Sequence, residues 1–205
     1  AIILHKLELM VANKPSAEKL VWNDDMIEVF ENAKRSTNDV QGVHIPIPTD
    51  KLYTFSDYSA MHKAIGGRLE IERMNEDGST VRLNGGYFSA TVDANRSKWL
   101  ACEGESLAVR LVIEHFANYI RENFNTTIHY TDNLPTVFAW KKSLKGAYST
   151  SPRISTFLNG LSAYTIDIQH KPGSTMNTSD YLSRHPLKCD DQKCRICQFV
   201  QQWTE

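Results

Sequence analysis

The sequence predicts an α/β fold built on a mixed five-stranded sheet with flanking helices. Three apolar runs with strand character follow one another after residue 50, and only short turn-like segments separate them. Strands joined by short turns pair antiparallel. The two later strand-like runs are separated by long segments with helical periodicity, and connections of that length favour parallel pairing. We therefore expect three antiparallel strands followed by parallel ones.

The composition is that of a globular protein with a substantial core. Of the 205 residues, 41% are hydrophobic and 10% aromatic, and the net charge of −1 gives no sign of a nucleic-acid partner. Residues 1–50 carry 5 Lys or Arg against 8 Asp or Glu, whereas residues 51–188 carry 16 against 13. The positive surplus of the second stretch permits phosphate binding without demanding it.

No segment has the pattern of a membrane span or a secretory leader. The apolar runs are shorter than the roughly 18 to 20 residues that cross a bilayer. We therefore expect no membrane contact and, for the four cysteines, a reducing intracellular compartment. Because the first residue is Ala1, we also expect a piece excised from a longer protein.

The first expected element is an amphipathic helix over residues 20–35. Apolar residues recur there at three- and four-residue steps from Trp22 to Ala33. Asn23 is suited to cap the helix, because its side-chain oxygen can accept a backbone N–H of the first turn.

The antiparallel part of the sheet is expected over residues 51–59, 63–74 and 80–92. The second and third strands are joined by NEDGS, in which Asp77 and Gly78 have turn chemistry. The later elements follow from the same periodicities. In chain order they are a helix over 105–120, a strand over 125–132, helices over 134–145 and 151–164, a strand over 164–173 and a short helix over 177–184.

Four acids lie where these elements begin or end, which is where α/β folds gather their functional side chains. Carboxylates that converge raise one another's pKa unless divalent cations neutralise them, and hard oxygen ligands select Mg²⁺ or Mn²⁺. The set is therefore a candidate two-metal site for phosphoryl transfer. Any one acid alone is more simply a helix cap or a strand terminus, so the hypothesis depends on the set. Its members are Asp57, Glu105, Asp132 and Asp180.

Glu103 competes with Glu105 for the position on the first long helix. Two residues apart on a helix, the side chains point about 200° apart. Only Glu105 lies three and four residues before the apolar pair Ala108 and Val109, and so faces the sheet. We therefore select Glu105.

Five segments together have the pattern of one enzyme family. They are YTFSDYS, GGYFSATV, ESLAV, IHYTDN and the closing region RISTFLNGLSAYTIDIQHKPGSTMNTSDYLSR. On these segments, residues 50–186 resemble the ribonuclease H (RNase H) domain of LTR-retrotransposon reverse transcriptases of the Ty3/gypsy type. The terminal family pattern is matched by Pro172, Gly173, Asn177, Asp180, Leu182, Ser183 and Arg184.

The resemblance implies an RNase H-like fold and metal-dependent hydrolysis of the RNA strand of an RNA/DNA hybrid. It implies that Asp57 bridges two Mg²⁺ (or Mn²⁺) ions. Glu105 and Asp132 would complete one site, and Asp180 would hold the other. His170 precedes Asp180 by ten positions (180 − 170), like the mobile-loop histidine of retroviral and cellular relatives. It is expected to shuttle a proton or to assist product release, the alternative being a surface histidine at a strand end.

The N-terminal helix loosely matches the connection that follows the polymerase in this family, through Trp22, Phe30 and Lys34. The Tyr-x-Asp-Asp motif of the polymerase is absent from the sequence. The expected partners are therefore an RNA/DNA hybrid and the polymerase domain of the same polyprotein, inside a cytoplasmic retroelement particle.

Three parts of the chain are expected, with a boundary near Asp50, because Pro46 and Pro48 enforce extended chain before it. They are a reverse transcriptase connection segment over residues 1–49, an RNase H domain over 50–186, and a cysteine-containing linker toward an integrase over 187–205.

The sequence departs from the family at two places beside the acids. Tyr58 follows the first aspartate, where relatives carry a small residue, and Asn133 follows the second, where many relatives carry Ser or His. These changes leave the ligands intact, but no substrate contact beyond the acids can be assigned.

The tail offers a second, weaker metal pattern. His185, Cys189, Cys194 and Cys197 are four Zn²⁺ ligand types, but only Cys194 and Cys197 have the two-residue gap of a zinc knuckle. Reduced thiols in a linker are the alternative. Cys102 is expected to be a buried apolar group.

Two other functions remain open. The chain can be an RNase H-like scaffold that has lost activity and tethers a hybrid within a larger polymerase, although the presence of all four acids argues against decay. A retroviral-type integrase would need a glutamate on a late helix as its last acid, where this chain has Asp180.

Overall fold

The structure is a computed structural model that describes residues 19, 21–38, 42–92, 99–149, 151–186 and 193–204. The chain divides into two compact units, Ala1–Gly42 and Val43–Glu205, and each is described by itself. The three-part division with boundaries at residues 49 and 186 remains a prediction.

The first unit contains one described helix, α2 (Asp24–Asn38). Asn23 Oδ1 accepts a hydrogen bond of 2.8 Å from the backbone N–H of Met26, so the expected cap is present. Trp22 and Phe30, one pair of the predicted apolar face, meet edge to face with ring centroids 5.2 Å apart.

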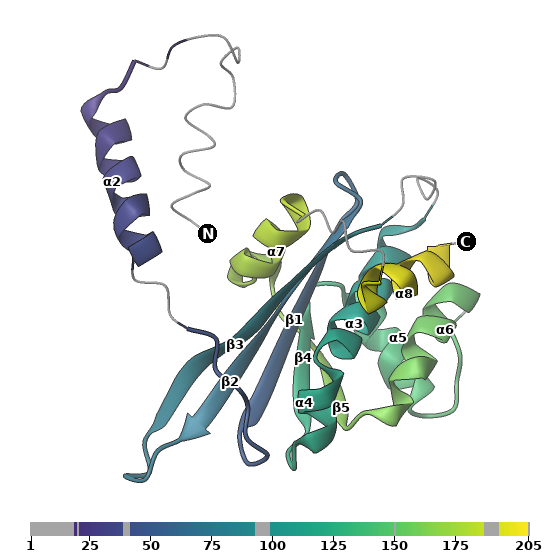
Figure 1. The fold of residues 1–205 in the computed structure, drawn as a ribbon. Coiled ribbons are helices and arrows are strands. Elements are labelled where there is room, and N and C mark those ends of the chain that lie inside the picture. Colours follow the sequence, from purple (N-terminus) through teal and green to yellow (C-terminus); the bar gives the residue numbers. More distant parts are fainter. Residues whose placement is uncertain are drawn as a thin grey trace. The chain divides into compact units, whose positions relative to one another are not determined.

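The second unit is built on the predicted mixed sheet, which is confirmed. The strand order is β3-β2-β1-β4-β5 (Figure 1). The first three strands pair antiparallel, and β4 and β5 join the other edge of β1 in parallel. The strands are β1 (Lys51–Ser59), β2 (Ala64–Met74), β3 (Thr80–Thr91), β4 (Thr127–Thr131) and β5 (Ile166–His170).

The helices cover the two faces of the sheet unequally. In Figure 1, α3 to α6 and α8 lie on one side of the sheet and α7 lies on the other. The helices are α3 (Ala101–His115), α4 (Ala117–Glu122), α5 (Leu134–Ser143), α6 (Pro152–Asn159), α7 (Asn177–Arg184) and α8 (Arg195–Thr204), with short 3₁₀ turns η2 (Gly160–Ala163) and η3 (Gly173–Thr175).

Two predicted helices of the second unit are interrupted or shortened in the structure. The helix expected over residues 105–120 begins at Ala101 and breaks at Phe116, whose φ of −96° and ψ of 14° separate α3 from α4. The break sets the buried Phe116 ring beside Gly86 of β3. The helix expected over 151–164 ends at Asn159 and continues only as the 3₁₀ turn η2. In the tail, where no helix was expected, α8 packs on α3 and buries Val200 in the core.

α3 is the central helix of the core. Ten of its residues are buried, which means that neighbours cover it on nearly every side. The sheet lies against one side, through β1 and β2, and α6 packs against α3 as well.

Two adjacent glycines of β2 let a helix approach each face of the sheet. A Cβ on Gly66 would lie 2.1 Å from the carbonyl oxygen of Ser179 in α7. A Cβ on Gly67 would lie 2.4 Å from Cγ2 of Val112 in α3. Because Gly66 pairs with Asp57 across the strands, the close seat of α7 lies directly beside the first candidate acid.

Candidate active site

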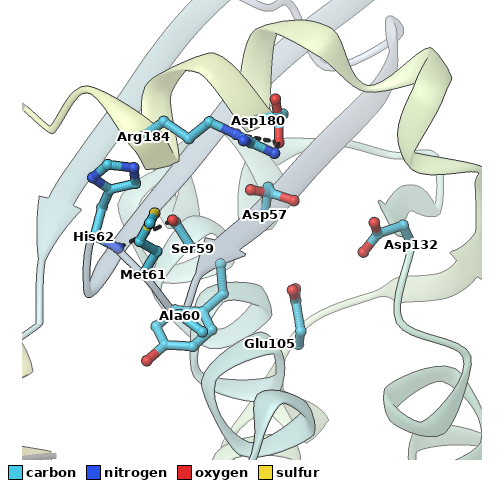
Figure 2. Close-up of a pocket in the computed structure, with 10 residues that line it drawn as sticks. Asp57, Ser59, Ala60, Met61, His62, Glu105, Asp132, Asp180 and Arg184 are labelled. Carbon is cyan, nitrogen blue, oxygen red and sulfur yellow. Dashed lines mark hydrogen bonds and ion pairs between the residues drawn. The ribbon is translucent and has the colours of Figure 1, made fainter. Parts of the chain in front are cut away.

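Three of the four predicted acids meet at one end of the sheet. Asp57 lies near the end of β1, Asp132 directly follows β4, and Glu105 lies in α3. One carboxylate oxygen from each residue lies within 4.8 Å of the others, and Figure 2 shows the three side chains directed toward a common space. Among the described residues, no other group of three His, Cys, Asp or Glu side chains is gathered in this way.

Strand pairing explains why the two aspartates meet. β1 and β4 are parallel neighbours with Phe55 opposite Tyr130, so both strands deliver the residue two positions later to the same edge. The carboxyl ends of adjacent parallel strands are a common place for functional side chains.

A buried histidine holds these two strands together just before the acids. His129 of β4 makes hydrogen bonds of 2.9 Å to the hydroxyls of Thr54 and Ser56 on β1, one at each ring nitrogen. Burial lowers the pKa of His129 to about 3, so the ring is neutral and one nitrogen accepts while the other donates. The relative position of Asp57 and Asp132 is therefore fixed by side-chain as well as backbone bonds.

Glu105 is the most buried acid of the group. Its side chain is buried, and burial raises the pKa of its carboxyl well above the usual value, with Asp57 and Asp132 adding to the rise. The backbone N–H of Tyr58 hydrogen-bonds to the carboxylate, but Oε2 has no partner in the described part of the chain. A buried oxygen of this kind is costly unless another group compensates it.

Glu103 has a structural role at the start of α3. Its carboxylate accepts from the backbone N–H of Leu100 at 3.2 Å and from Ser151 Oγ at 2.9 Å, and it pairs with Arg153 at 3.4 Å. Glu103 therefore caps α3, and the structure places Glu105 in the acidic group.

The charge of Asp57 is only partly compensated. Burial raises its pKa, as do the nearby Asp180 and Asp132. A hydrogen bond of 2.5 Å from Ser183 Oγ to Asp57 Oδ2 and the positive charge of Arg184 act in the opposite direction.

Asp180 lines the same pocket but is already engaged. Its Oδ1 accepts from Nε and Nη2 of Arg184, at 2.9 and 2.7 Å. Its carboxylate is not part of the three-acid group. The open pocket has a volume of about 310 Å³ and is lined by Asp57, Tyr58, Ser59, Ala60, Met61, His62, Glu105, Asp132, Asp180 and Arg184.

His170 lies apart from this lining. It is exposed at the end of β5, where its backbone pairs with Thr131. The histidine that lines the pocket is His62, in the turn between β1 and β2. Strand periodicity alone gives no signal for His62, because the residue lies in the turn.

Two glycines lie beside the acids. Gly173 is part of the terminal pattern in the sequence, without a role assigned to it, and Gly104 was not singled out. A Cβ on Gly173 would lie 2.7 Å from Oδ2 of Asp132, so this glycine leaves room for the carboxylate. A Cβ on Gly104 would lie 2.1 Å from Cε1 of Tyr58. Gly104 therefore leaves room for the ring of Tyr58, which is buried against α3.

The predicted zinc site falls partly outside the described residues, because Cys189 is among those not described. His185 stacks on Tyr181 with ring centroids 4.2 Å apart and contacts the Tyr181 carbonyl oxygen through Nδ1 at 3.0 Å. The zinc site therefore stays a prediction. Across the described residues, no helix has both the length and the apolarity needed to cross a membrane.

Comparison with known proteins finds viral relatives for the sequence. No family model matches the chain. The chain is 26% identical over 166 residues to the enzymatic polyprotein of cauliflower mosaic virus, in strains D/H and Strasbourg alike. The match covers 80% of this chain and 23% of the polyprotein, so the chain spans about a quarter of the length of these relatives.

Comparison with solved structures finds two kinds of protein, both with TM-scores below 0.5. One is the foamy viral protease-reverse transcriptase dRH in complex with double-stranded DNA, with a TM-score of 0.47 and 13% identity over 83% of this chain and 30% of that chain. Another is RNase H1 from the halophilic archaeon Halobacterium salinarum, with a TM-score of 0.38 and 17% identity over 65% of this chain and 93% of that chain.

Proposed function

We propose that this chain is a retroelement RNase H domain, an endonuclease that hydrolyses the RNA strand of RNA/DNA hybrids by two-metal-ion catalysis. The observation that carries the proposal is the group formed by Asp57, Glu105 and Asp132, with ligand atoms within 4.8 Å of one another. The family motifs around these residues and the sequence similarity to a viral enzymatic polyprotein support it.

The acids suit divalent cations in both chemistry and solvation. Carboxylate oxygens are the ligands that Mg²⁺ and Mn²⁺ prefer. Glu105 Oε2 is buried with no partner among the described residues, and a cation would supply the missing compensation. Asp57, Glu105 and Asp132 would hold one ion, with Asp57 and Asp180 at a second. Bound cations of this kind lower the pKa of a water and stabilise charge on the leaving oxygen.

The contribution of the chain itself is to hold the carboxylates in place and to offset part of the free-energy cost of their charge. Ser183 donates to Asp57, and the backbone N–H of Tyr58 hydrogen-bonds to Glu105, which favours the charged form of each acid. Gly173 leaves space for the carboxylate of Asp132. The chain thus presents oxygen ligands at the edge of an open pocket, where a phosphodiester backbone can reach them.

We further propose that the domain works as part of a polyprotein. Its partners would be the hybrid and the polymerase domain of the same polyprotein, within a cytoplasmic retroelement particle. The net charge of −1 fits this arrangement, because the polymerase would then supply much of the grip on the nucleic acid.

The test is cleavage of labelled RNA in an RNA/DNA hybrid with Mg²⁺. We expect Asp57→Asn and Asp132→Asn each to reduce the rate by more than about 100-fold, since even partners of metal ligands cost 10- to 100-fold when lost. Asp167→Asn is the matched control, because this acid lies on β5 and is not part of the described pocket lining. It should keep cleavage within about threefold of wild type, as expected for a substitution outside the site.

One result would replace the proposal. If the chain, joined to its polymerase neighbour, binds the hybrid with wild-type acids yet never cuts it, the inactive scaffold becomes the better description.

A further inference from the structure

The fourth acid of the pocket is held by a cation of the protein. Asp180 and Arg184 lie one helical turn apart on α7, and both line the pocket. Two nitrogens of the guanidinium donate to the same oxygen, Oδ1 of Asp180, at 2.9 and 2.7 Å. Figure 2 shows this ion pair next to Asp57.

The carboxylates of Asp180 and Glu105 therefore differ in their hydrogen bonding. Glu105 Oε2 has no hydrogen-bond partner in the described part of the chain, whereas Asp180 Oδ1 has two. A divalent cation that used Asp180 Oδ1 would have to displace the guanidinium. The positive charge of Arg184 also acts on Asp57, so one side chain opposes the negative charge of two acids.

The helix that carries the pair is firmly seated. Gly66 brings β2 against the backbone of α7 at Ser179, and Ser183 is fully buried with its hydroxyl on Asp57. Asp180 and Arg184, in contrast, keep side chains that are 40% and 55% exposed. Separation of the pair requires rotation of two partly exposed side chains and no movement of the helix.

We propose that Arg184 is a positioning residue that holds the carboxylate of Asp180 in the metal-free protein and releases it when a divalent cation enters beside Asp57. This inference depends on the proposed metal site. Arg184 competes with the cation for the same oxygen. It weakens the second metal site more than the first, which is built on Asp57, Glu105 and Asp132.

The competition is tested by titrating the full chain with Mn²⁺ and measuring free Mn²⁺ by electron paramagnetic resonance, with no nucleic acid present. Arg184→Gln should bind the Asp180-dependent ion roughly two- to fivefold more tightly, as expected when a partly exposed ion pair is removed. Arg184→Lys keeps the charge but loses the two-nitrogen geometry, so it should fall between wild type and Arg184→Gln.

A double-mutant cycle separates this competition from a general effect of charge. In the Asp180→Asn background, Arg184→Gln should change Mn²⁺ affinity by less than about twofold, because the carboxylate for which it competes is gone. Lys171→Gln is the matched charge control. Its ammonium lies over the ring of Phe55, at 5.0 Å from the centroid, on the strand that carries Asp57. The Lys171→Gln variant should not increase the affinity for Mn²⁺.

The inference is overturned if Arg184→Gln leaves Mn²⁺ binding unchanged or weaker while its thermal unfolding matches wild type. It is also overturned if the tightening persists in the Asp180→Asn background. Failure of the proposed function would look different, because Mn²⁺ binding that depends on Asp57 would then be missing from wild type as well.

Discussion

Individual residues of the site differ in how well their charges are compensated. Burial is the first cause that raises the pKa of both Asp57 and Glu105, and neighbouring acids raise both further. The hydrogen bond from Ser183 offsets part of the rise in the pKa of Asp57, whereas Glu105 has only the backbone N–H of Tyr58. Glu105 is therefore the residue whose ionisation depends most on a bound cation.

Replacing Glu105 by Gln should stabilise the metal-free protein while it weakens the metal site that Glu105 shares with Asp57 and Asp132. The folded state holds the Glu105 proton to a higher pH than the unfolded chain, whose pKa is near 4.5. The stability contributed by this group therefore falls as pH rises from 4.5 toward the folded pKa. Since Gln carries no charge, thermal unfolding in EDTA should show a larger gain in Tm over wild type at pH 8 than at pH 5.

Glu103→Gln is the control for this prediction. It lies on the same helix, but it weakens the cap of α3 and the ion pair with Arg153. It should lower Tm at both pH values. A gain in Tm for Glu105→Gln that is the same at pH 5 and pH 8 would contradict the account of Glu105.

The position of the Tyr58 ring follows from the structure and not from the sequence. The sequence shows a large residue directly after the first acid, and it gives no sign of where the ring goes. The ring lies against Gly104 on α3, so the glycine between two glutamates compensates for the tyrosine. Residues far apart in sequence share one space, and a single sequence contains no signal that pairs them.

At the scale of elements, α7 and the β1–β4 pair determine where the acids lie. The family pattern in the sequence includes Ser183 and Arg184 but assigns them no role. Their roles follow from the packing of α7 on the sheet, which brings the Ser183 hydroxyl to Asp57.

Helical periodicity did not predict the break at Phe116 between α3 and α4, because apolar residues continue on both sides of it.

Removal of the Ser183 hydroxyl should weaken the site more than it weakens the fold. Ser183→Ala leaves Asp57 without its hydrogen-bond donor, and loss of such a partner typically lowers metal affinity or activity 10- to 100-fold. Ser89→Ala is the matched control, because the Ser89 hydroxyl bonds to the Leu182 carbonyl oxygen of the same helix without touching Asp57. Mn²⁺ titration should separate the variants, and equal losses in both would show that only helix seating matters.

The His129 contact between β1 and β4 should make the fold sensitive to acid. The pKa of His129 is about 3 in the folded protein, against an ordinary histidine value of 6.5, so the unfolded chain takes up the proton first. Stability from this group is complete above pH 6.5 and is lost as pH falls. At pH 5 the loss should be about 2 kcal/mol, since each pKa unit corresponds to about 1.4 kcal/mol.

Urea unfolding at pH 7 and pH 5 measures this loss by comparing wild type with His129→Gln. The acids, including Glu105, titrate alike in both proteins, so their contribution cancels in the difference. The variant should be less stable at pH 7, because the bonds to Thr54 and Ser56 are altered, yet less sensitive to acid. If both proteins lose the same stability between pH 7 and pH 5, His129 is not the cause of the acid sensitivity.

At the scale of the whole molecule, the sequence predicted the sheet, whereas the boundary of the domain stays a prediction. Alternating apolar residues locate the strands, because one face of each strand must be buried. The N-terminal segment of the second unit is held instead by single hydrogen bonds. Its extended chain has no periodic pattern of apolar residues that would predict them. Pro46 and Pro48 predict a boundary near Asp50, and residues 43–49 belong to the second compact unit. The boundary itself stays a prediction.

Residues 43–49 are expected to stabilise the second unit, although they belong to no helix or strand. The backbone N–H of His44 bonds to Asn84, the carbonyl oxygen of Ile45 accepts from Arg73, and that of Pro48 accepts from Phe124. A fragment that begins at residue 50 should lose roughly 1 to 3 kcal/mol of unfolding free energy against one that begins at residue 43, since each net hydrogen bond contributes about 1 kcal/mol. Urea midpoints of the two fragments measure this difference, and equal midpoints would show that the boundary near Asp50 is the physical one.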